Sequence, residues 1–296
     1  DMTTQITGRE PRLSLQIGKH GEHRLSLRKL ASMLNILPPD AVSLPALEEM
    51  LRNEEFFVRY NAAQLLGRRG DREARLIVQN ALTTGEAPTR ASVARHLYGF
   101  SWYSSEPLLR QALKDRDPRV REAAIYALCD LRELNAYQLM TSVLKAEGDD
   151  VKMAAAWGLR NSQDPAAVPV LDAVLTAEDP EVRIKGLEAL GQNDTPEAMP
   201  VVRQAMNDPD PDVKYAATLS LLELAGEAWL HELSGIIGRT HGVTRQQVLR
   251  GFFHATNYLK IDVAKTKSAD LLIDALETAL LDELEDVRMA CAWPLA

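Results

Sequence analysis

The sequence predicts an all-α protein, a right-handed α-solenoid of about eight two-helix repeats. Only 5% of its 296 residues are aromatic, while Ala, Leu, Glu and Arg, which lose little side-chain freedom in a helix, are abundant. The stretch DPRVREAAIYAL at 117–128 returns in altered form as DPEVRIKGLEAL at 179–190 and DPDVKYAATLSL at 210–221. The copies are evenly spaced, which indicates a stack of similar helical units rather than a two-domain globule.

The period is visible in a recurring pair, an apolar or β-branched residue followed by a cation, at steps of 31 residues. The pairs are Val58-Arg59, Thr89-Arg90, Val120-Arg121, Val151-Lys152, Val182-Arg183, Val213-Lys214 and Thr244-Arg245. One step back lies Leu27-Arg28, so we expect residues 1–40 to be a cap with a degenerate repeat, followed by the array in 41–296. The next pair, Val287-Arg288, comes 43 residues on, which predicts about 12 inserted residues near 254–270.

Each unit is predicted to hold two helices joined by a tight turn. The turn carries the pairs Asp117-Pro118, Asp179-Pro180 and Asp210-Pro211, and proline suits a turn or a first helical position. In the second helix a small residue and, four positions on, a large one form an apolar stripe, which stacking on the neighbouring units buries. The small column is Ala31, Ala62, Val93, Ala124, Ala155, Gly186, Ala217 and Val248, and the large column is Leu66, Leu97, Leu128, Leu159, Leu190, Leu221 and Phe252.

The two ends of the chain depart from this pattern. Residues 12–27, RLSLQIGKHGEHRLSL, alternate apolar and polar side chains around a glycine-containing turn, which predicts a short β-hairpin in the cap. The last unit stops within its second helix and has no polar outer cap, so we expect the native chain to continue or a partner to cover this end, by an end-to-end contact. Cys129 and Cys291 lie five repeats apart, too far for a disulfide, and are expected to be ordinary core residues.

These motifs resemble those of a known family. DPRVREAAIYAL, DPEVRIKGLEALG and VRYNAAQLLGRRGD are similar to HEAT repeats, in particular the short bacterial variety of phycobilisome-lyase-type proteins, over most of the chain. A proline column in the first helix belongs to the same resemblance: Pro45, Pro107, Pro169 and Pro200. The resemblance implies that the second helices line a concave surface, but it implies no single function, because the scaffold hosts adaptors, lyase subunits and a few enzymes.

The cation column has two interpretations, a phosphate-binding stripe or a structural ladder. Acidic residues stand at each turn, where they are placed to pair with the cations, and in HEAT proteins such pairs link neighbouring repeats. We therefore expect a structural ladder. The acidic residues are Asp115, Asp117, Asp149, Asp150, Asp179, Asp210 and Asp212.

The candidate site lies at second-helix positions one, five and eight after the cation, which share one helical face. In the resembling family this face is the inner lining of a groove, and here it is rich in Tyr, Trp and Arg, the residue types enriched at binding hot spots. The predicted binding residues are Tyr60, Arg95, Tyr98, Tyr126, Trp157, Arg160, Tyr215, Arg250 and Phe253, and Trp293 falls at the same position of the last repeat. We expect a non-catalytic scaffold or adaptor that holds a peptide or helix of a partner protein; the alternative is that several of these residues pack between repeats.

Other function classes have weaker support. The net charge of −8 argues against a general nucleic-acid binder, and no apolar run is long enough to span a membrane, so we expect a cytoplasmic protein without a cofactor. A phycobilin-lyase-like subunit that stacks a tetrapyrrole is the alternative function, and a HEAT-like DNA glycosylase using Trp157 with Glu122 or Glu188 is a weaker one. The pair His231-Glu232 is similar to the metal motif of HEAT-type deoxyhypusine hydroxylases, which needs several copies, so we expect no metal site.

Overall fold

The computed structural model describes the backbone of residues 12–16, 22–26 and 36–295 and the side chains of residues 36–292. Strands β1 (Arg12–Gln16) and β2 (Glu22–Ser26) pair antiparallel, with Arg12 opposite Ser26 and Ser14 opposite Arg24. This confirms the hairpin that the alternating pattern predicts. The degenerate repeat predicted at Leu27-Arg28 lies outside the described residues.

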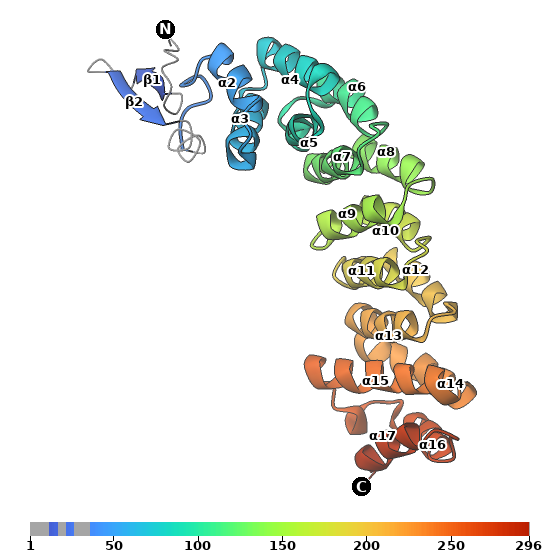
Figure 1. Ribbon diagram of the computed structural model, residues 1–296. Helices are drawn as coiled ribbons and strands as arrows, with labels where there is room; N and C mark the ends of the chain where they lie inside the picture. The colour runs from blue at the N-terminus through green and yellow to red at the C-terminus, as the bar shows by residue number, and fades with distance from the viewer. Residues whose placement is uncertain (1–11, 17–21, 27–35, 296) are drawn as a thin grey trace. The chain divides into compact units, whose positions relative to one another are not determined.

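The chain divides into two compact units, residues 1–136 and 137–296. Figure 1 shows the helices in sequence order along each unit. The first unit contains α2 (Leu44–Leu51), α3 (Phe56–Arg69), α4 (Arg72–Thr84), α5 (Ala87–Arg95), η1 (Leu97–Gly99), α6 (Trp102–Ala112) and α7 (Pro118–Leu131). Helix α8 (Leu134–Leu144) begins at the boundary. The second unit contains α9 (Asp149–Leu159), η2 (Pro165–Ala167), α10 (Val168–Val174), α11 (Pro180–Gly191), α12 (Ala198–Gln204), η3 (Ala205–Asn207), α13 (Pro211–Ala225), η4 (Gly226–Trp229), α14 (Leu230–Arg239), α15 (Gly242–Leu259), η5 (Val263–Lys265), α16 (Ala269–Ala279) and α17 (Glu285–Leu295).

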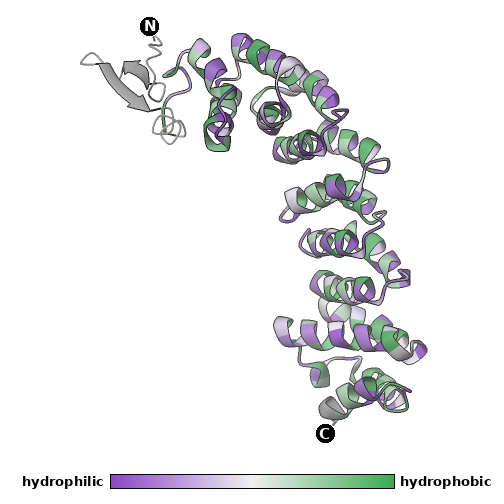
Figure 2. Ribbon diagram, viewed as in Figure 1, coloured by the Kyte–Doolittle hydropathy of each residue, from purple (hydrophilic) through white to green (hydrophobic). Residues whose placement is uncertain are grey.

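Each repeat is a pair of helices, and the described residues form eight such pairs, from α2–α3 to α16–α17. The second helices stack in order, α3 on α5 and α5 on α7 in the first unit, and α9 through α11, α13 and α15 to α17 in the second. The small and large columns lie in these contacts: Ala124, Leu128, Ala217 and Leu221 are fully buried. Figure 2 shows apolar and polar residues alternating along each helix. The predicted α-solenoid of about eight repeats is confirmed.

The Asp-Pro turns begin the second helices. The carboxylates of Asp117, Asp179 and Asp210 are N-caps, each accepting a hydrogen bond from the backbone N–H two residues on, and the proline occupies the first turn. A carboxylate at this position satisfies an amide that has no partner within the helix and interacts favourably with the helix dipole. These three residues are therefore caps and not the ladder partners that the turn pattern predicts.

The ladder itself uses a different acidic column. Arg90 Nε and Nη2 donate to the two carboxylate oxygens of Asp115 over 2.7 and 2.8 Å, and Arg183 binds Asp208 in the same way, with both distances 2.9 Å. Arg245 Nη1 bonds Asp282 over 2.9 Å, where the carboxylate is fully buried. Of the predicted acids only Asp115 serves in these three pairs. The structural interpretation is thus confirmed for them, with the partner column two residues before the helix cap.

Residues 254–270 form the last turns of α15, an 18-residue helix, and the connection with η5 that leads to α16. The boundaries predicted for the cap and the array, 1–40 and 41–296, stay a prediction. Among the described residues, no helix combines the length and apolar character needed to cross a membrane. Cys129 and Cys291 are both buried free thiols, and burial raises their pKa to about 12 and about 11.

Candidate functional site

The first unit has a cavity on the exposed face of its second helices, which we call the second-helix cavity. Its volume is about 420 Å³, and its lining comes from α3, α5 and α7. Three predicted binding residues, Tyr60, Arg95 and Tyr126, line it together, one from each helix. The 31-residue period explains why these three side chains lie together, because equivalent positions on consecutive stacked helices become neighbours.

Arg95 is held at the centre of this group. Its guanidinium carbon lies 5.6 Å from the ring centroid of Tyr98 and 5.6 Å from that of Tyr126, and its Nη1 donates to Asp130 over 2.6 Å. Each guanidinium–ring contact of this type contributes about 0.5–1 kcal/mol at an exposed site. Arg95 and the two tyrosines are therefore positioned before any partner binds.

The buried side chain of His96 packs against Tyr60 of the same group. His96 is 2% exposed, its ring meets that of Tyr60 edge to face at 4.5 Å, and its Nδ1 bonds the carbonyl of Ser92 over 2.9 Å. Burial lowers the pKa of His96 to about 4, so the ring is neutral at pH 7. Partial burial likewise raises the pKa of Tyr98 and Tyr126, which keeps both hydroxyls protonated. The repeat pattern did not single out His96, because this residue lies in none of the selected columns.

The backbone near His96 also differs from the regular pattern. Helix α5 ends at Arg95, and Tyr98 lies in the short helix η1. A side chain at Gly99 would meet the backbone carbonyl of Gly67 at 2.3 Å, so only glycine permits this approach of η1 to α3. Tyr98 thus reaches Arg95 from a turn, although the period predicts a continuous helix.

In the second unit Trp157 on α9 is 45% exposed and stacks against two cations. Arg160 lies 5.4 Å and Lys185 Nζ 5.8 Å from its ring. Lys185 also donates to both carboxylate oxygens of Glu188 over 3.0 Å. The predicted residues Trp157 and Arg160 are therefore neighbours, and Lys185 is a participant that the selected columns left out.

Two repeats further on, Tyr215 of α13 forms a similar group with α15. Arg250 lies 5.1 Å from its ring, and the Tyr215 hydroxyl is 2.7 Å from His254 Nδ1. The pKa of Glu223 is raised by partial desolvation and by the nearby charge of Glu188, while His254 acts in the opposite direction. Predicted residues Tyr215 and Arg250 thus lie together, with His254 as an additional member.

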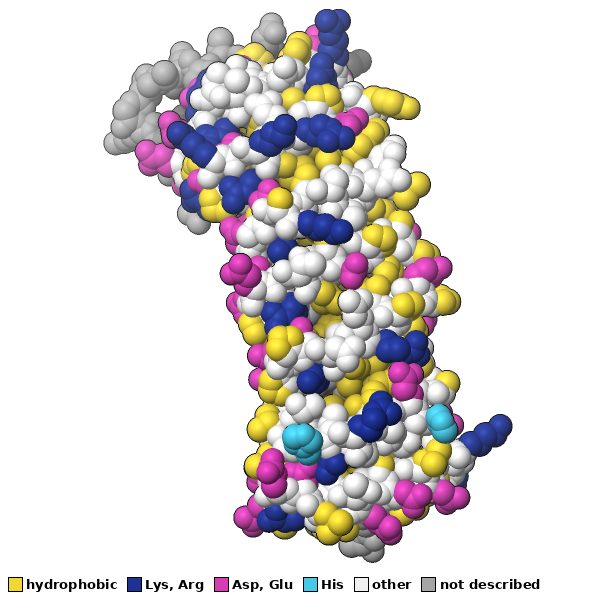
Figure 3. Space-filling view, turned by 90° about the vertical axis from the view of Figure 1, so that its right-hand side faces the viewer, with side chains coloured by type: hydrophobic (Ala, Val, Ile, Leu, Met, Phe, Trp, Pro, Cys, Tyr) yellow, Lys and Arg dark blue, Asp and Glu magenta, His cyan; other side chains and the backbone are white. Residues whose placement is uncertain are grey.

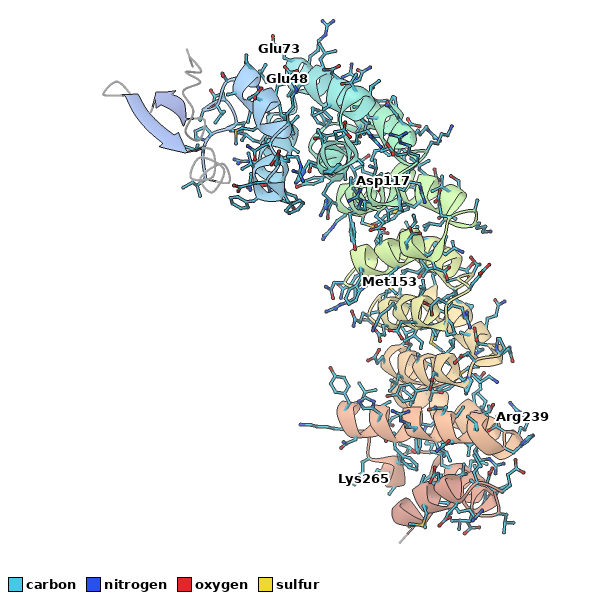
Figure 4. The ribbon with its side chains drawn as sticks, viewed as in Figure 1. Glu48, Glu73, Asp117, Met153, Arg239 and Lys265 are labelled. Carbon is cyan, nitrogen blue, oxygen red and sulfur yellow. The ribbon has the colours of Figure 1, made fainter. Side chains whose placement is uncertain are left out.

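The remaining predicted residues lie apart from these groups. Phe253 lines a cavity of about 360 Å³ with Phe252, Ile261 and residues of α16, beside the inserted segment. Met153, on the same predicted face, is labelled beside α9 in Figure 4. Trp293 belongs to α17, but its side chain is outside the described residues.

The His231-Glu232 pair lies on α14. Glu232 of the His231-Glu232 pair bonds Arg203 over 3.0 Å. Among the side chains that the structure describes, no three of His, Cys, Asp or Glu are grouped as metal ligands.

The opposite face, that of the first helices, carries charges of both signs interspersed with apolar side chains (Figure 3).

Three solved structures are similar to the chain. YibA of Escherichia coli is 15% identical, with a TM-score of 0.50 and coverage of 92% of this chain and 98% of YibA. The CpcE–CpcF complex of phycocyanin lyase from Nostoc is 21% identical over 86% of this chain and 93% of that one, with a TM-score of 0.33. The karyopherin Kap121p, solved with the extreme C-terminus of the phosphatase Cdc14p, is 13% identical over 90% of this chain and 34% of its own, with a TM-score of 0.48. At these identities the likeness concerns the fold alone.

Sequence comparison is more specific about the family. No curated protein is significantly similar to the chain in sequence. A family model described as HEAT repeats matches residues 75–160, 105–188, 137–222 and 168–251, overlapping segments that together span more than half of the chain. The chain therefore belongs to the HEAT-repeat family.

Proposed function

We propose that this protein is a non-catalytic scaffold that binds a segment of a partner protein in the second-helix cavity of its first unit. One observation carries the proposal: Tyr60, Arg95 and Tyr126, from three consecutive second helices, line a single cavity, and Arg95 is fixed between two tyrosine rings. Aromatic and arginine anchors held in place before binding lose little conformational freedom when a partner arrives.

The charges around the cavity favour an acidic segment. Arg59, Arg95 and Arg119 line it against the single acid Glu122. Arg95 forms an ion pair with Asp130, and Arg119 forms one with Asp117, so the excess of positive charge around the cavity is moderate. Complementary charge of this size affects partner choice and association rate more than affinity.

The second unit supplies further exposed aromatic side chains. Trp157 and Tyr215 each stack against cations on the second-helix face, so an extended partner has additional contact positions there. These groups support the proposal less strongly, because neither Trp157 nor Tyr215 is among the residues that line the second-helix cavity.

Peptide selection tests the proposal. A random dodecapeptide library displayed on phage is selected on the immobilised full chain, and the enriched peptides are titrated against wild type, Tyr126→Ala and Tyr103→Ala. Tyr103 is the matched control, since it is 89% exposed and lies on α6, a first helix. We expect Tyr126→Ala to lower affinity about 30-fold, the effect of a hot-spot residue, and Tyr103→Ala to leave it unchanged. Equal affinities for all three proteins would refute the proposal.

A further inference from the structure

The first unit has a second cavity, the turn cavity, where α2 and the turn after it meet the end of α4 and the start of α5. Its volume is about 580 Å³, and Arg59, Thr84 and Glu48 are among its lining residues. Glu48 is labelled on α2 in Figure 4. Arg59 and Pro88 line both the turn cavity and the second-helix cavity, so the two cavities adjoin on the same pair of repeats.

Arg90 and Arg183 show how an arginine at this position binds a carboxylate. In Arg183, Nη1 donates to the carbonyls of Ala177 and Glu178, six and five residues back, while Nε and Nη2 donate to the two oxygens of Asp208. Arg90 binds Asp115 through the same two nitrogens. In Arg183, Nη1 thus donates to backbone carbonyls of the turn before its own helix, while the Nε–Nη2 edge of the guanidinium binds a carboxylate from the next repeat.

Arg59 makes the first set of bonds but lacks the second. Its Nη1 donates to the carbonyls of Asn53 and Glu54 over 2.8 and 2.5 Å, again six and five residues back. The side chain is 9% exposed, and its Nε is buried without a hydrogen-bond partner. Within the described part of the chain, no carboxylate forms an ion pair with Arg59. It therefore has an unused edge of the kind that binds Asp in the repeats of Arg90 and Arg183.

The missing carboxylate is explained by one residue. Position 84 lies 31 residues before Asp115, in the column that supplies Asp115 and Asp208, and here it is threonine. Thr84 is exposed, and its hydroxyl donates to the carbonyl of Asn80, so it does not replace the acid. The turn cavity is lined by both members of this incomplete pair, Arg59 and Thr84.

We propose that the turn cavity binds the carboxylate of an Asp or Glu side chain in an extended segment of the partner, which completes the ladder at Arg59. A guanidinium edge matches a carboxylate geometrically, and a buried donor without a partner gains a bond that water does not supply. The inference rests on the proposed function, since the same segment crosses Arg59 and Pro88 from the second-helix cavity. Binding requires a small movement of Arg59 or of the atoms that cover its Nε.

The surrounding charges favour a single carboxylate over a phosphate group. Glu48, Glu54 and Glu86 also line the turn cavity. Arg52, the other cation there, is already bonded to Glu48 over 2.7 Å. A doubly charged group would meet three acids with one unpaired arginine, whereas a singly charged carboxylate is matched by Arg59 alone.

The test uses the peptides selected on the full chain. The most strongly enriched acidic peptide, with an amidated C-terminus, is titrated against wild type, Arg59→Lys and Thr84→Asp, and a copy with Gln for Glu or Asn for Asp is titrated against wild type. Lysine keeps the charge but has no Nε–H edge, and an aspartate at 84 competes with the peptide for Arg59. We expect at least a tenfold loss of affinity in each case. Arg110→Lys, at another exposed arginine paired within its helix, and Thr83→Asp, at an exposed position that does not line the turn cavity, are the matched controls and should bind as wild type does.

A second measurement follows Arg59 itself and does not depend on how well a variant folds. In a ¹H–¹⁵N spectrum of the wild-type chain, the acidic peptide should shift the Arg59 Nε–H resonance downfield, toward those of Arg90 and Arg183, and the amide copy should not. If the resonance stays in place and Arg59→Lys binds normally while Tyr126→Ala does not, the carboxylate site is wrong and the proposed function stands. If wild type enriches no acidic peptide, the carboxylate site is wrong; if it enriches no peptide at all, both proposals are wrong.

Discussion

The two units use the same repeat, but their second-helix surfaces differ. In the first unit Tyr60, Arg95 and Tyr126 line one cavity, and a single arginine contacts two tyrosine rings. In the second, Trp157 and Tyr215 lie on α9 and α13, and each stacks on cations of its own. The difference teaches that aromatic side chains at equivalent repeat positions do not by themselves line a common cavity. Consecutive repeats must bring their variable residues to the same point.

The ladder differs between repeats in a related way. Arg245 and Asp282 in the second unit form a pair with side chains 7% and 0% exposed, whereas Arg59 in the first unit has threonine at the partner position. The complete pair joins two repeats through an ion pair, whereas the incomplete one leaves Arg59 Nε buried without a hydrogen-bond partner. The following predictions test both contrasts.

The largest effect is expected from breaking the most buried pair. Asp282→Ala leaves the Arg245 guanidinium buried without its carboxylate, which should cost about 3–5 kcal/mol of the free energy of unfolding. Asp282 has a lowered pKa despite its burial, because the backbone amides of Leu284 and Gly242 and the charge of Arg245 stabilise its anion. Urea unfolding of the full chain measures the loss, with the exposed Glu283→Ala as control. A midpoint unchanged from wild type would show that the pair is not a structural element.

The next effect is a pH dependence confined to the first unit. Unfolded His96 takes up a proton near its ordinary pKa of 6.5, but the folded residue does so only near pH 4, so acid favours the unfolded chain. Stability should fall by about 2 kcal/mol more between pH 7.5 and pH 5 in wild type than in His96→Asn. Arg95 strengthens this effect and Asp130 weakens it. The control is His254→Asn, at an exposed position of the second unit, which should keep the wild-type pH dependence of stability. If wild type and His96→Asn lose stability equally between pH 7.5 and pH 5, the lowered pKa of His96 is contradicted.

A smaller effect compares Arg95 of the first unit with Arg160 of the second. Arg95→Ala removes two guanidinium–ring contacts beside the second-helix cavity, and Arg160→Ala removes one contact with Trp157. A selected peptide should bind Arg95→Ala about tenfold more weakly and Arg160→Ala within about twofold of wild type. Calorimetric titration distinguishes the two, and an equal loss in both would mean that the units contribute alike.

We expect the protein not to bind a tetrapyrrole pigment. Biliverdin added to the full chain should keep its free absorption spectrum, since the proposed ligand is a polypeptide. A red-shifted, saturable absorption band that Trp157→Ala abolishes would instead favour the tetrapyrrole alternative and place the function in the second unit.

Periodic features of this molecule could be predicted from the sequence, because every repeat restates them. The buried columns, such as Ala124 and Leu128, follow from the 31-residue period and helical spacing. The acid column of the ladder was missed in part, since Asp208 lies two residues before the more conspicuous Asp210-Pro211 turn, and Asp282 lies after the insertion that breaks the 31-residue spacing. The spacing of Asp115 and Asp208, three periods apart, was the signal that could have revealed it.

Features found in one repeat only could not be predicted in this way. The early end of α5, the approach of Gly99 to Gly67 and the burial of His96 depend on contacts between helices, which the period does not encode. Phe253 shares its column with Tyr98, yet it lines a cavity beside the inserted residues, because the insertion changes what lies next to α15.

Photocrosslinking tests the central claim most directly. Benzoylphenylalanine is placed at Tyr126, at Trp157 or at Tyr103 in three separate preparations of the full chain, and each is irradiated with a selected peptide. The peptide should be captured from position 126, in the second-helix cavity of the first unit, with much less from 157 and none from 103. Capture from 103 or 157 at the level found for 126 would contradict the account.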